Sequence, residues 1–354
     1  MTSNEFLHFF PAPTFLQMPT AGLDIADGEI RFIELREDRG VLGLQNYGMQ
    51  KIANDVIEEG SIEKKEELVA ALTKIREENG LKFVRVSLPE EKSYVFHTTV
   101  PYAANPDEMR DAISFTIEEN VPLSAENVVF DYNVIGRKSV KVSEDVDVAV
   151  SALPINVVEM YIDVIRSSGL RPMSLMVESQ AIARSVVPKE NPNSFLVINI
   201  DTETSVVYIV NNNTVHFTSA FPTKNAGSSV LTSSTSITQE GELVDNKEDS
   251  ISEEDTFFSN ASEILAEVKR VYDYWHSRGI GSQKDNQVKK FLICGDHALD
   301  KQFQKKLAET FSVDVETANV WINAMTFDES VPEIPVDEAL RYAAAIGLAL
   351  PQNI

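Results

Sequence analysis

The sequence AGLDIADGEIRFIELREDRGVLGLQNYGM at residues 21–49 has a counterpart half a chain later, SFLVINIDTETSVVYIVNNNTVHFTSAF at residues 194–221. Each copy predicts an apolar strand that ends in an aspartate, a polar turn, a second strand, another turn and a third strand. The two aspartates, Asp24 and Asp201, are 177 residues apart in a chain of 354. This internal duplication predicts two related lobes that face each other across a cleft.

The sequence between the two copies predicts a separate unit. Residues 83–170 contain strand patterns, a helix from Pro106 to about Asn120 and a helix from Ile155 to Ser168, which together predict an α+β subdomain inserted in the first lobe. Residues 62–78 predict an amphipathic surface helix. The expected domains are an N-terminal tail at 1–20, the first lobe at 21–82, 171–193 and 336–354, the insert at 83–170 and the second lobe at 194–335.

Composition excludes several classes of protein. The chain has 31 Lys and Arg against 55 Asp and Glu, a net charge of −24, which argues against binding to nucleic acid or directly to anionic lipid. Cys294 is the single cysteine, so no intrachain disulfide can form, and the chain is expected to be cytosolic. The sequence shows neither a signal peptide nor an apolar stretch long enough to span a bilayer.

Two segments stand apart from the predicted lobes. Residues 239–263 carry nine acidic residues and one lysine, which predicts a flexible acidic insertion at about 233–256 in the second lobe. Residues 1–20 are rich in phenylalanine and proline. They are interpreted as a tail that packs on the protein's own surface or stays loose, with a partner-binding arm as the alternative.

The predicted cleft could hold a nucleotide. Asp24 and Asp201 at strand ends would suit a nucleotide-bound Mg²⁺, which needs only one or two carboxylates beside phosphate oxygens. Gly28 would allow the backbone to approach a phosphate closely. FLICGDHAL at residues 291–299 predicts a strand that turns at Gly295 and Asp296, and such a turn can lie under an adenine or ribose. An ordinary strand end is the alternative for each of these positions.

The order of these elements resembles the actin-like (ribonuclease H-like) fold, and within it the PilM family of type IV pilus assembly proteins, relatives of the cell-division protein FtsA. The matching segments are GLDIADGEIRFIEL, FTIEENVPLSAENVVFDYNVIG, LMVESQAIARSV, VINIDTETS, FLICGDHAL and ALRYAAAIGLAL. The resemblance covers nearly the whole chain and implies an α/β fold of two duplicated lobes with an inserted α+β subdomain. It implies nucleotide-binding candidates at Asp24, Gly28, Arg31, Asp201, Thr204, Ser205, Gly227, Gly295 and Asp296, with Mg²⁺ held through Asp24 and Asp201.

The chain departs from the family at each nucleotide-binding segment. The family's first phosphate loop typically reads Asp-Ile-Gly-Ser-Ser-Ser-x-Lys, whereas residues 24–31 read Asp-Ile-Ala-Asp-Gly-Glu-Ile-Arg. Asp27 and Glu29 place carboxylates where a polyphosphate would lie, and such like charges repel. The second loop and the adenosine loop each lose a glycine, at Glu203 and Asp296. These changes favour a scaffold without catalytic residues over an ATPase. The expected cofactor is Mg-ATP if the cleft still binds a nucleotide, and none if it does not.

The resemblance also implies a partner. PilM proteins lie under the inner membrane and hold the cytoplasmic N-terminal peptide of the bitopic protein PilN beside the inserted subdomain. The expectation is therefore a cytoplasmic protein, peripheral at the inner face of the membrane through a PilN-like protein. Candidate groove residues are Phe96, Val100, Tyr102, Phe115 and Val121, each with a place in the ordinary core as the alternative. An active ATP-binding member of the family and an FtsA-like cell-division protein are the alternative functions.

Overall fold

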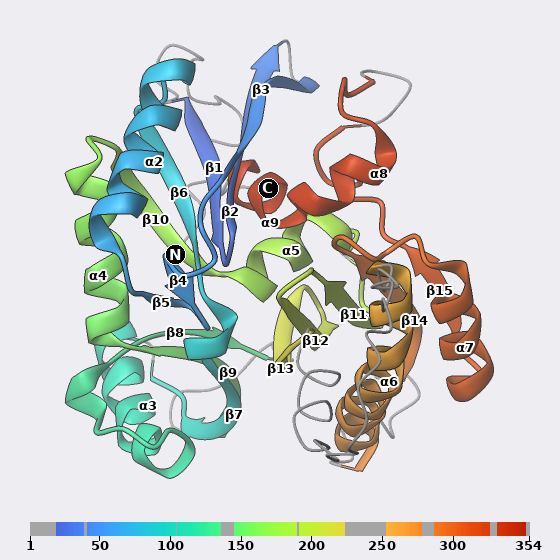
Figure 1. The fold of residues 1–354 in the computed structure, drawn as a ribbon. Coiled ribbons are helices and arrows are strands. Elements are labelled where there is room, and N and C mark those ends of the chain that lie inside the picture. Colours follow the sequence, from blue (N-terminus) through green and yellow to red (C-terminus); the bar gives the residue numbers. More distant parts are fainter. Residues whose placement is uncertain are drawn as a thin grey trace, which may run out of the picture.

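Two five-stranded sheets form the centres of two lobes, and a three-stranded sheet belongs to a third unit beside the first lobe (Figure 1). The structure is a computed structural model. It describes residues 19–38, 41–103, 105–135, 145–189, 191–223, 253–277, 287–325 and 331–351.

The first lobe is built on a sheet of order β10-β6-β1-β2-β3. Its strands are β1 (Thr20–Ala26), β2 (Glu29–Asp38), β3 (Val41–Lys51), β6 (Phe83–Leu88) and β10 (Arg171–Val177). β1 runs antiparallel to β2 and parallel to β6. Helices α2 (Lys65–Asn79) and α4 (Ile155–Ser167) pack their apolar residues against one face of the sheet. A short hairpin of β4 (Ile57–Glu58) and β5 (Ser61–Ile62) precedes α2.

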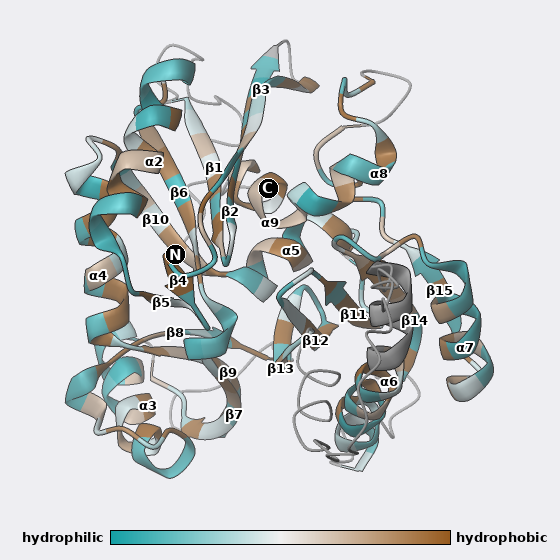
Figure 2. Ribbon diagram, in the orientation of Figure 1, coloured by the Kyte–Doolittle hydropathy of each residue, from teal (hydrophilic) through white to brown (hydrophobic). Residues whose placement is uncertain are grey.

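The second lobe repeats this plan with the order β13-β12-β11-β14-β15. Its elements are β11 (Ser194–Ile200), β12 (Thr204–Asn211), β13 (Thr214–Pro222), α6 (Glu253–Ser277), β14 (Val288–Cys294), α7 (Lys301–Phe311) and β15 (Asp314–Thr317). In both sheets an antiparallel meander of three strands is extended by two parallel strands. The predicted duplication is therefore confirmed. Figure 2 shows hydrophilic residues along the outer sides of α2 and α7.

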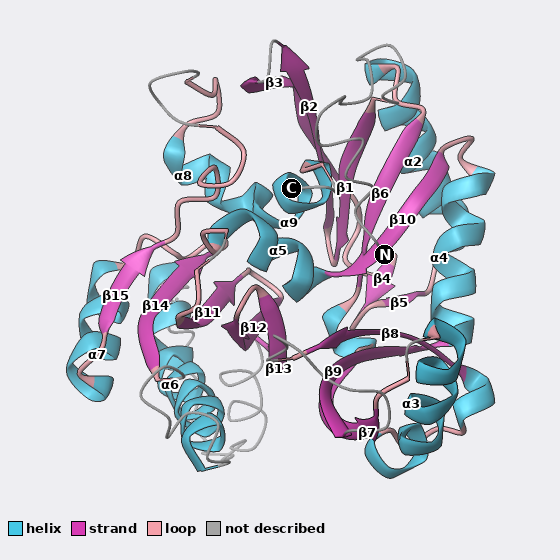
Figure 3. Ribbon diagram, turned by 180° about the vertical axis from the view of Figure 1, so that it is seen from behind, coloured by secondary structure: helices cyan, strands magenta, loops and turns pink. Residues whose placement is uncertain are grey.

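Two helices occupy the space between the sheets, as the view from behind shows (Figure 3). They are α5 (Glu178–Val186) and α9 (Ala343–Ala349), and α9 follows α8 (Val336–Ala339) and the turn η4 (Leu340–Tyr342). α9 is buried along its whole length. A Cβ at Gly22 of β1 would lie 2.0 Å from the carbonyl oxygen of Ala345, and a Cβ at Gly347 would lie 1.7 Å from that of Ala181. Glycine at both positions lets α9 contact the first sheet and α5.

The insert is a sheet of order β7-β9-β8 covered by one helix. Its elements are β7 (Tyr94–Pro101), α3 (Pro106–Asn120), η3 (Ala125–Asn127), β8 (Val128–Val134) and β9 (Asp145–Pro154), and η2 (Glu90–Lys92) leads into it. α3 buries Met109, Ile113 and Ile117 against this sheet. β7 also meets β13 of the second lobe, where the rings of His97 and His216 are 4.4 Å apart. The ring of His216 lies 5.1 Å from that of Trp275 on α6.

Several predicted boundaries need correction. β6 (residues 83–88) lies between β1 and β10, and α4 packs in the first core, so both belong with the first lobe and not with the insert. Thr20 is the first residue of β1, so it does not belong to the tail. Residues 253–256 are the start of α6, so they do not belong to the acidic insertion. The rest of that insertion and residues 1–18 lie outside the described residues.

Candidate functional site

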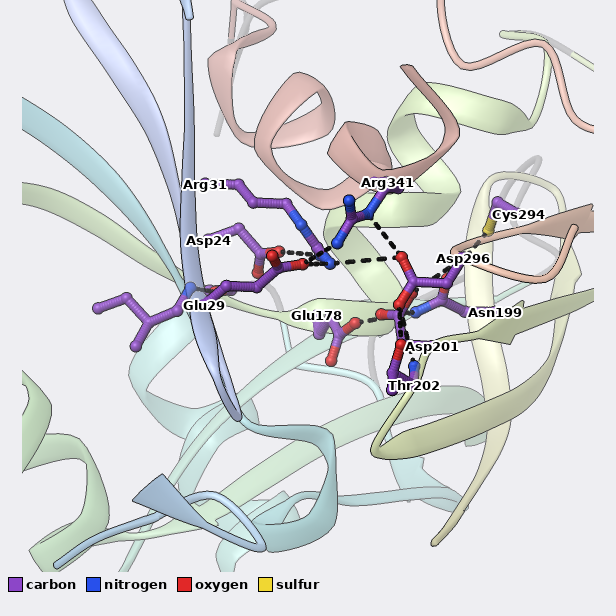
Figure 4. Close-up of polar contacts among 12 residues, drawn as sticks. Asp24, Glu29, Arg31, Glu178, Asn199, Asp201, Thr202, Cys294, Asp296 and Arg341 are labelled. Atoms are coloured by element: carbon purple, nitrogen blue, oxygen red, sulfur yellow. Dashed lines mark hydrogen bonds and ion pairs between the residues drawn. The ribbon is translucent and has the colours of Figure 1, made fainter. Parts of the chain in front are cut away.

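A cavity of about 230 Å³ lies between the two lobes. The turn between β1 and β2 forms one wall and the turn between β11 and β12 forms another, and Asp296 after β14, Arg341 of η4 and Glu178 of α5 are also part of the lining. The two strand-end turns face each other because the duplicated strands β1 and β11 both end here (Figure 4). The carboxylates that line the cavity outnumber the cations by seven to three.

Two arginines and three carboxylates form a connected network in this cleft (Figure 4). Nη2 of Arg31 contacts Oε1 of Glu29 and lies 3.9 Å from Oδ1 of Asp296, and its Nη1 lies 3.6 Å from Oδ2 of Asp24. Arg341 donates from Nη2 to Oε1 of Glu29 at 2.7 Å, and its Nε lies 2.6 Å from Oδ1 of Asp296. We call these five residues the cleft network. It joins β1 and β2 of the first lobe to η4 and to the second lobe.

A second set of contacts fixes the loops of the second lobe. Gly295 has φ +90°, and a Cβ there would lie 2.6 Å from the carbonyl oxygen of Ile200. This turn places Asp296 so that its Oδ2 accepts hydrogen bonds from the backbone N and the Oγ1 of Thr202, at 3.0 and 2.5 Å. Nδ2 of Asn199 donates to Glu178 at 3.1 Å and to Asp201 at 3.1 Å. The loops after β11 and β14 are therefore tied to each other and to the start of α5.

Burial sets the protonation of these groups. It raises the pKa of Asp201 to about 6, although the positive charge of Arg31 opposes that shift. Burial also raises the pKa of Glu178 well above its ordinary value, and the nearby charges of Asp24 and Asp201 add to the effect. Burial alone would raise the pKa of Asp296, but the hydrogen bonds from Thr202 and the charges of Arg31 and Arg341 lower it. The surroundings therefore favour the ionised form of Asp296 and the protonated form of Glu178.

Arg31 on β2 is the cation around which the carboxylates of the cleft are arranged. Burial alone would lower the pKa of Arg31, but the surrounding carboxylates of Asp201, Asp24, Glu29 and Asp296 raise it above its ordinary value. Arg31 is therefore always charged, and only 3% of its surface is exposed. A guanidinium so enclosed by carboxylates has little capacity left for a further anion.

The predicted nucleotide-binding residues have different positions. Gly28, Arg31, Asp201, Thr204 and Asp296 line the cavity. Asp24 is buried behind it in the cleft network. The Oγ of Ser205 is buried and shares a hydrogen bond of 2.8 Å with Oγ1 of Thr223, so that hydroxyl faces away from the cleft. Gly295 shapes the turn, and Gly227 lies outside the described residues.

Asp24 and Asp201, the predicted Mg²⁺ ligands, contact protein groups in the structure. Asp24 is ion-paired with Arg31, and Asp201 accepts hydrogen bonds from Asn199 and from the backbone N of Asp296. Within the described ranges, no group of three His, Cys, Asp or Glu residues is arranged to hold a metal ion.

Sequence reasoning missed two members of the site, Arg341 and Glu178. Both lie in segments that resemble the family, but their roles depend on partners from other elements. Arg341 is the single charged residue of the segment ALRYAAAIGLAL at residues 339–350. A lone arginine in an apolar segment is the sequence feature that could have indicated a functional role.

The five predicted groove residues do not share one exposed wall. Val100 and Val121 are buried in the core of the insert, because the inward positions of β7 and the residue after α3 face its helix and sheet. Phe96 and Tyr102 are half-buried against that core. Phe115, on the outer side of α3, is 82% exposed. The prediction of a groove lined by all five is therefore wrong for Val100 and Val121. None of the described helices combines the length and apolar character that crossing a bilayer requires.

Solved structures are similar to this chain over most of its length. One is a "PilM-PilN type IV pilus biogenesis complex", with TM-score 0.66 and 18% identity over 95% of this chain and 98% of that chain. The ethanolamine utilization protein EutJ from Carboxydothermus hydrogenoformans has TM-score 0.46 and 12% identity, over 96% and 90% of the two chains. MreB5 of Spiroplasma citri bound to ADP has TM-score 0.45 and 12% identity, over 87% and 94%.

The predicted fold class, a duplicated actin-like fold with an inserted subdomain, is confirmed by the two matching sheets and by the likeness to the first of these structures. No curated protein matches the sequence. The model of the family described as type IV pilus assembly protein PilM matches residues 22–353. Because that match spans nearly the whole chain, the chain belongs to the PilM family of type IV pilus assembly proteins.

Proposed function

We propose that this protein is a cytoplasmic scaffold of a type IV pilus assembly machine that is recruited to the inner face of the membrane by a PilN-like protein. Membership of the PilM family supports a place in that machine. The complex named for PilM and PilN has the same fold as this chain. The net charge of −24 favours recruitment through a protein over direct contact with anionic lipid.

We further propose that the ion pairs of the cleft network occupy the cleft, so that Mg-ATP does not bind there. Arg31 and Arg341, two of the three cations lining the cavity, are already paired with carboxylates. The cavity of about 230 Å³ is below the roughly 300–1,000 Å³ of typical ligand pockets. Carboxyl groups outnumber cations in the lining by seven to three, and those that are ionised would repel a polyphosphate. The residues present therefore do not fit a nucleotide.

Thermal unfolding with and without 1 mM Mg-ATP tests this part. The parent is expected to keep its melting temperature, because a ligand at 100 times its Kd would add about 2.7 kcal/mol of stability and shift the transition visibly. The triple variant Ala26→Gly, Asp27→Ser, Glu29→Ser is expected to gain a shift, since it removes two lining carboxylates, one of which, Glu29, is the shared partner of Arg31 and Arg341. Asp55→Ser, which removes an exposed carboxylate paired with Lys64, is the control. A clear rise for the parent would contradict the proposal.

The surface proposed for the partner peptide lies where the insert joins the first lobe. Among the described strands, β8 pairs only with β9, so its other edge can accept an extended peptide by backbone hydrogen bonds. Large apolar side chains are exposed on this part of the molecule, namely Phe115 on α3, Val129 on β8 and Met160 on α4. α4 contacts β8, which makes Val129 and Met160 candidates for one continuous surface.

Binding of a synthetic peptide from the cytoplasmic N-terminus of the PilN-like protein of the same organism tests this part. Val129→Asp is expected to weaken binding at least tenfold, because it sets a charge at an apolar contact. Val336→Asp on α8, at a position that is 70% exposed, is the matched control and is expected to leave binding unchanged. Equal affinities of the parent and the Val129 variant would place the peptide elsewhere.

A further inference from the structure

Three cations lie together where α5 and α9 end, in a chain where acidic residues outnumber basic ones by 55 to 31. Arg85 is on β6, Arg184 is on α5 and Lys189 follows α5. Among the described residues, no carboxylate forms an ion pair with any of the three. We call these residues the basic cluster. It lies apart from the cleft network and shares no residue with it.

Arg85 and Arg184 converge on the end of α9. Nη1 of Arg85 donates to the carbonyl oxygens of Leu348 and Leu350 at 3.1 and 2.7 Å. Nη2 of Arg184 donates to the carbonyl oxygens of Leu350 and Pro351 at 3.1 and 3.0 Å. Because both guanidiniums hydrogen-bond the same oxygen, that of Leu350, they are close neighbours.

Asn323 hydrogen-bonds the backbone of both Lys189 and Arg184, and so links the third cation to the two arginines. Its Nδ2 donates to the carbonyl oxygen of Arg184 at 2.8 Å, and its Oδ1 accepts from the backbone N of Lys189 at 3.1 Å. Nζ of Lys189 lies 3.5 Å from the carbonyl oxygen of Asn323. The end of α5 is therefore held so that Lys189 stays near Arg184.

Helix capping accounts for only part of this arrangement. Arginines near a helix C-terminus hydrogen-bond its last carbonyl groups, and the helix end carries roughly half a negative charge. Three full positive charges therefore exceed the roughly half negative charge at the end of α9 by about two and a half. Each guanidinium uses one nitrogen toward α9, and its other donors have no protein acceptor among the described residues. Burial lowers the pKa of Arg184 and of Lys189, and the charge of the neighbouring arginine lowers each further.

We propose that Arg85, Arg184 and Lys189 bind an oxyanion, a carboxylate or a phosphate, on the side of the guanidiniums that faces away from α9. A planar guanidinium offers paired N–H donors that match the oxygens of either group, and an ammonium adds a point charge. An anion there would neutralise the repulsion within the basic cluster. This site is independent of the cleft, so it stands whether or not the cleft binds nucleotide.

Calorimetry and thermal unfolding of the full chain test the site, at constant ionic strength set with chloride. The probes are inorganic phosphate, acetate and a short peptide with two adjacent glutamates. At least one is expected to bind and to raise the melting temperature. Binding of phosphate alone identifies a phosphate group as the ligand chemistry, and binding of the peptide identifies a carboxylate.

Matched variants keep the test falsifiable. Arg184→Gln retains an N–H donor for the carbonyls of α9, and Lys189→Gln leaves both arginines in place. Each is expected to weaken binding at least tenfold. Lys290→Gln, which removes a lysine paired with Asp314 and Glu316, is expected to bind like the parent. If none of the three probes binds, or if Arg184→Gln and Lys189→Gln bind as the parent does, the cluster caps α9 only and the proposal is overturned.

Discussion

Asp27, at the turn between β1 and β2, has other carboxylates as neighbours. Burial and the charges of Glu91 and Glu203 raise the pKa of Asp27 to about 6, although hydrogen bonds from the backbone N–H groups of Gly60 and Glu59 oppose the shift. In the unfolded chain its pKa returns to about 3.8. The folded state therefore binds this proton more tightly, so Asp27 contributes stability that is fully present below pH 3.8 and is lost as the pH rises from there through about 6.

Replacement by asparagine should remove that dependence. At pH 7.5 we expect Asp27→Asn to be more stable than the parent, by about 1 kcal/mol after allowance for the partly exposed side chain. At pH 3, below the unfolded pKa of about 3.8, the two proteins should unfold alike, because Asp27 is then protonated in both the folded and the unfolded parent. Urea unfolding at both pH values measures the difference. A stability gain that is equal at the two pH values would show that charge is not the cause.

The residues at strand ends could be identified from the sequence alone. Asp201, Gly28 and Asp296 line the cavity, and each follows an apolar strand that the sequence pattern predicts. Arg341 could not be assigned in the same way, because its role depends on Glu29, which is 312 residues away in the chain. Ser205 was predicted to face the cleft, but its hydroxyl is bonded to Thr223, a contact that the local sequence does not indicate.

At the scale of single elements, the N-terminal caps of α3 and α7 offer a test of whether the insert, and not the second lobe, binds the peptide. The side chain of Asn105 accepts from the backbone N of Asp107, and Asp300 caps α7 by accepting from Gln302 and Phe303. Asn105→Ala and Asp300→Ala should each cost about 1 kcal/mol of local stability. Asn105→Ala should speed hydrogen exchange in the insert and weaken binding of the PilN-like peptide, whereas Asp300→Ala should act on the second lobe only. Peptide binding that falls equally in both variants would contradict this division.

Individual strands could be predicted from the sequence more readily than the strands with which they pair. The period of two in FVRVSL predicts a strand at 83–88, and β6 is that strand. Its place between β1 and β10 depends on pairing with segments more than 60 residues away, and alternation of apolar residues carries no information about partners. The duplicated meanders were predictable for the opposite reason, since their strands pair with sequence neighbours through short turns.

At the scale of the whole molecule, the cleft network is a connection between the lobes. Arg341→Gln leaves the buried carboxylate of Glu29 and the half-buried carboxylate of Asp296 with one cation fewer, which should cost on the order of 2 kcal/mol. Lys290→Gln removes an ion-paired lysine at the surface and should cost less than about 1 kcal/mol. Urea unfolding compares the two, and small-angle X-ray scattering should show a larger radius of gyration for the Arg341 variant only. An unchanged radius would mean that the packing of α5 and α9 and the contact of β7 with β13 keep the lobes together without Arg341.

The contact between the insert and the second lobe has an optical consequence. Trp275 is one of two tryptophans in the chain, and its indole lies beside His216, which in turn meets His97 of the insert. The other, Trp321, is buried elsewhere in the core of the second lobe. Indole emission moves to longer wavelength when water replaces an apolar or aromatic neighbour. With Trp321 replaced by phenylalanine, the fluorescence of Trp275 becomes a label-free reporter of whether the insert is seated against the second lobe.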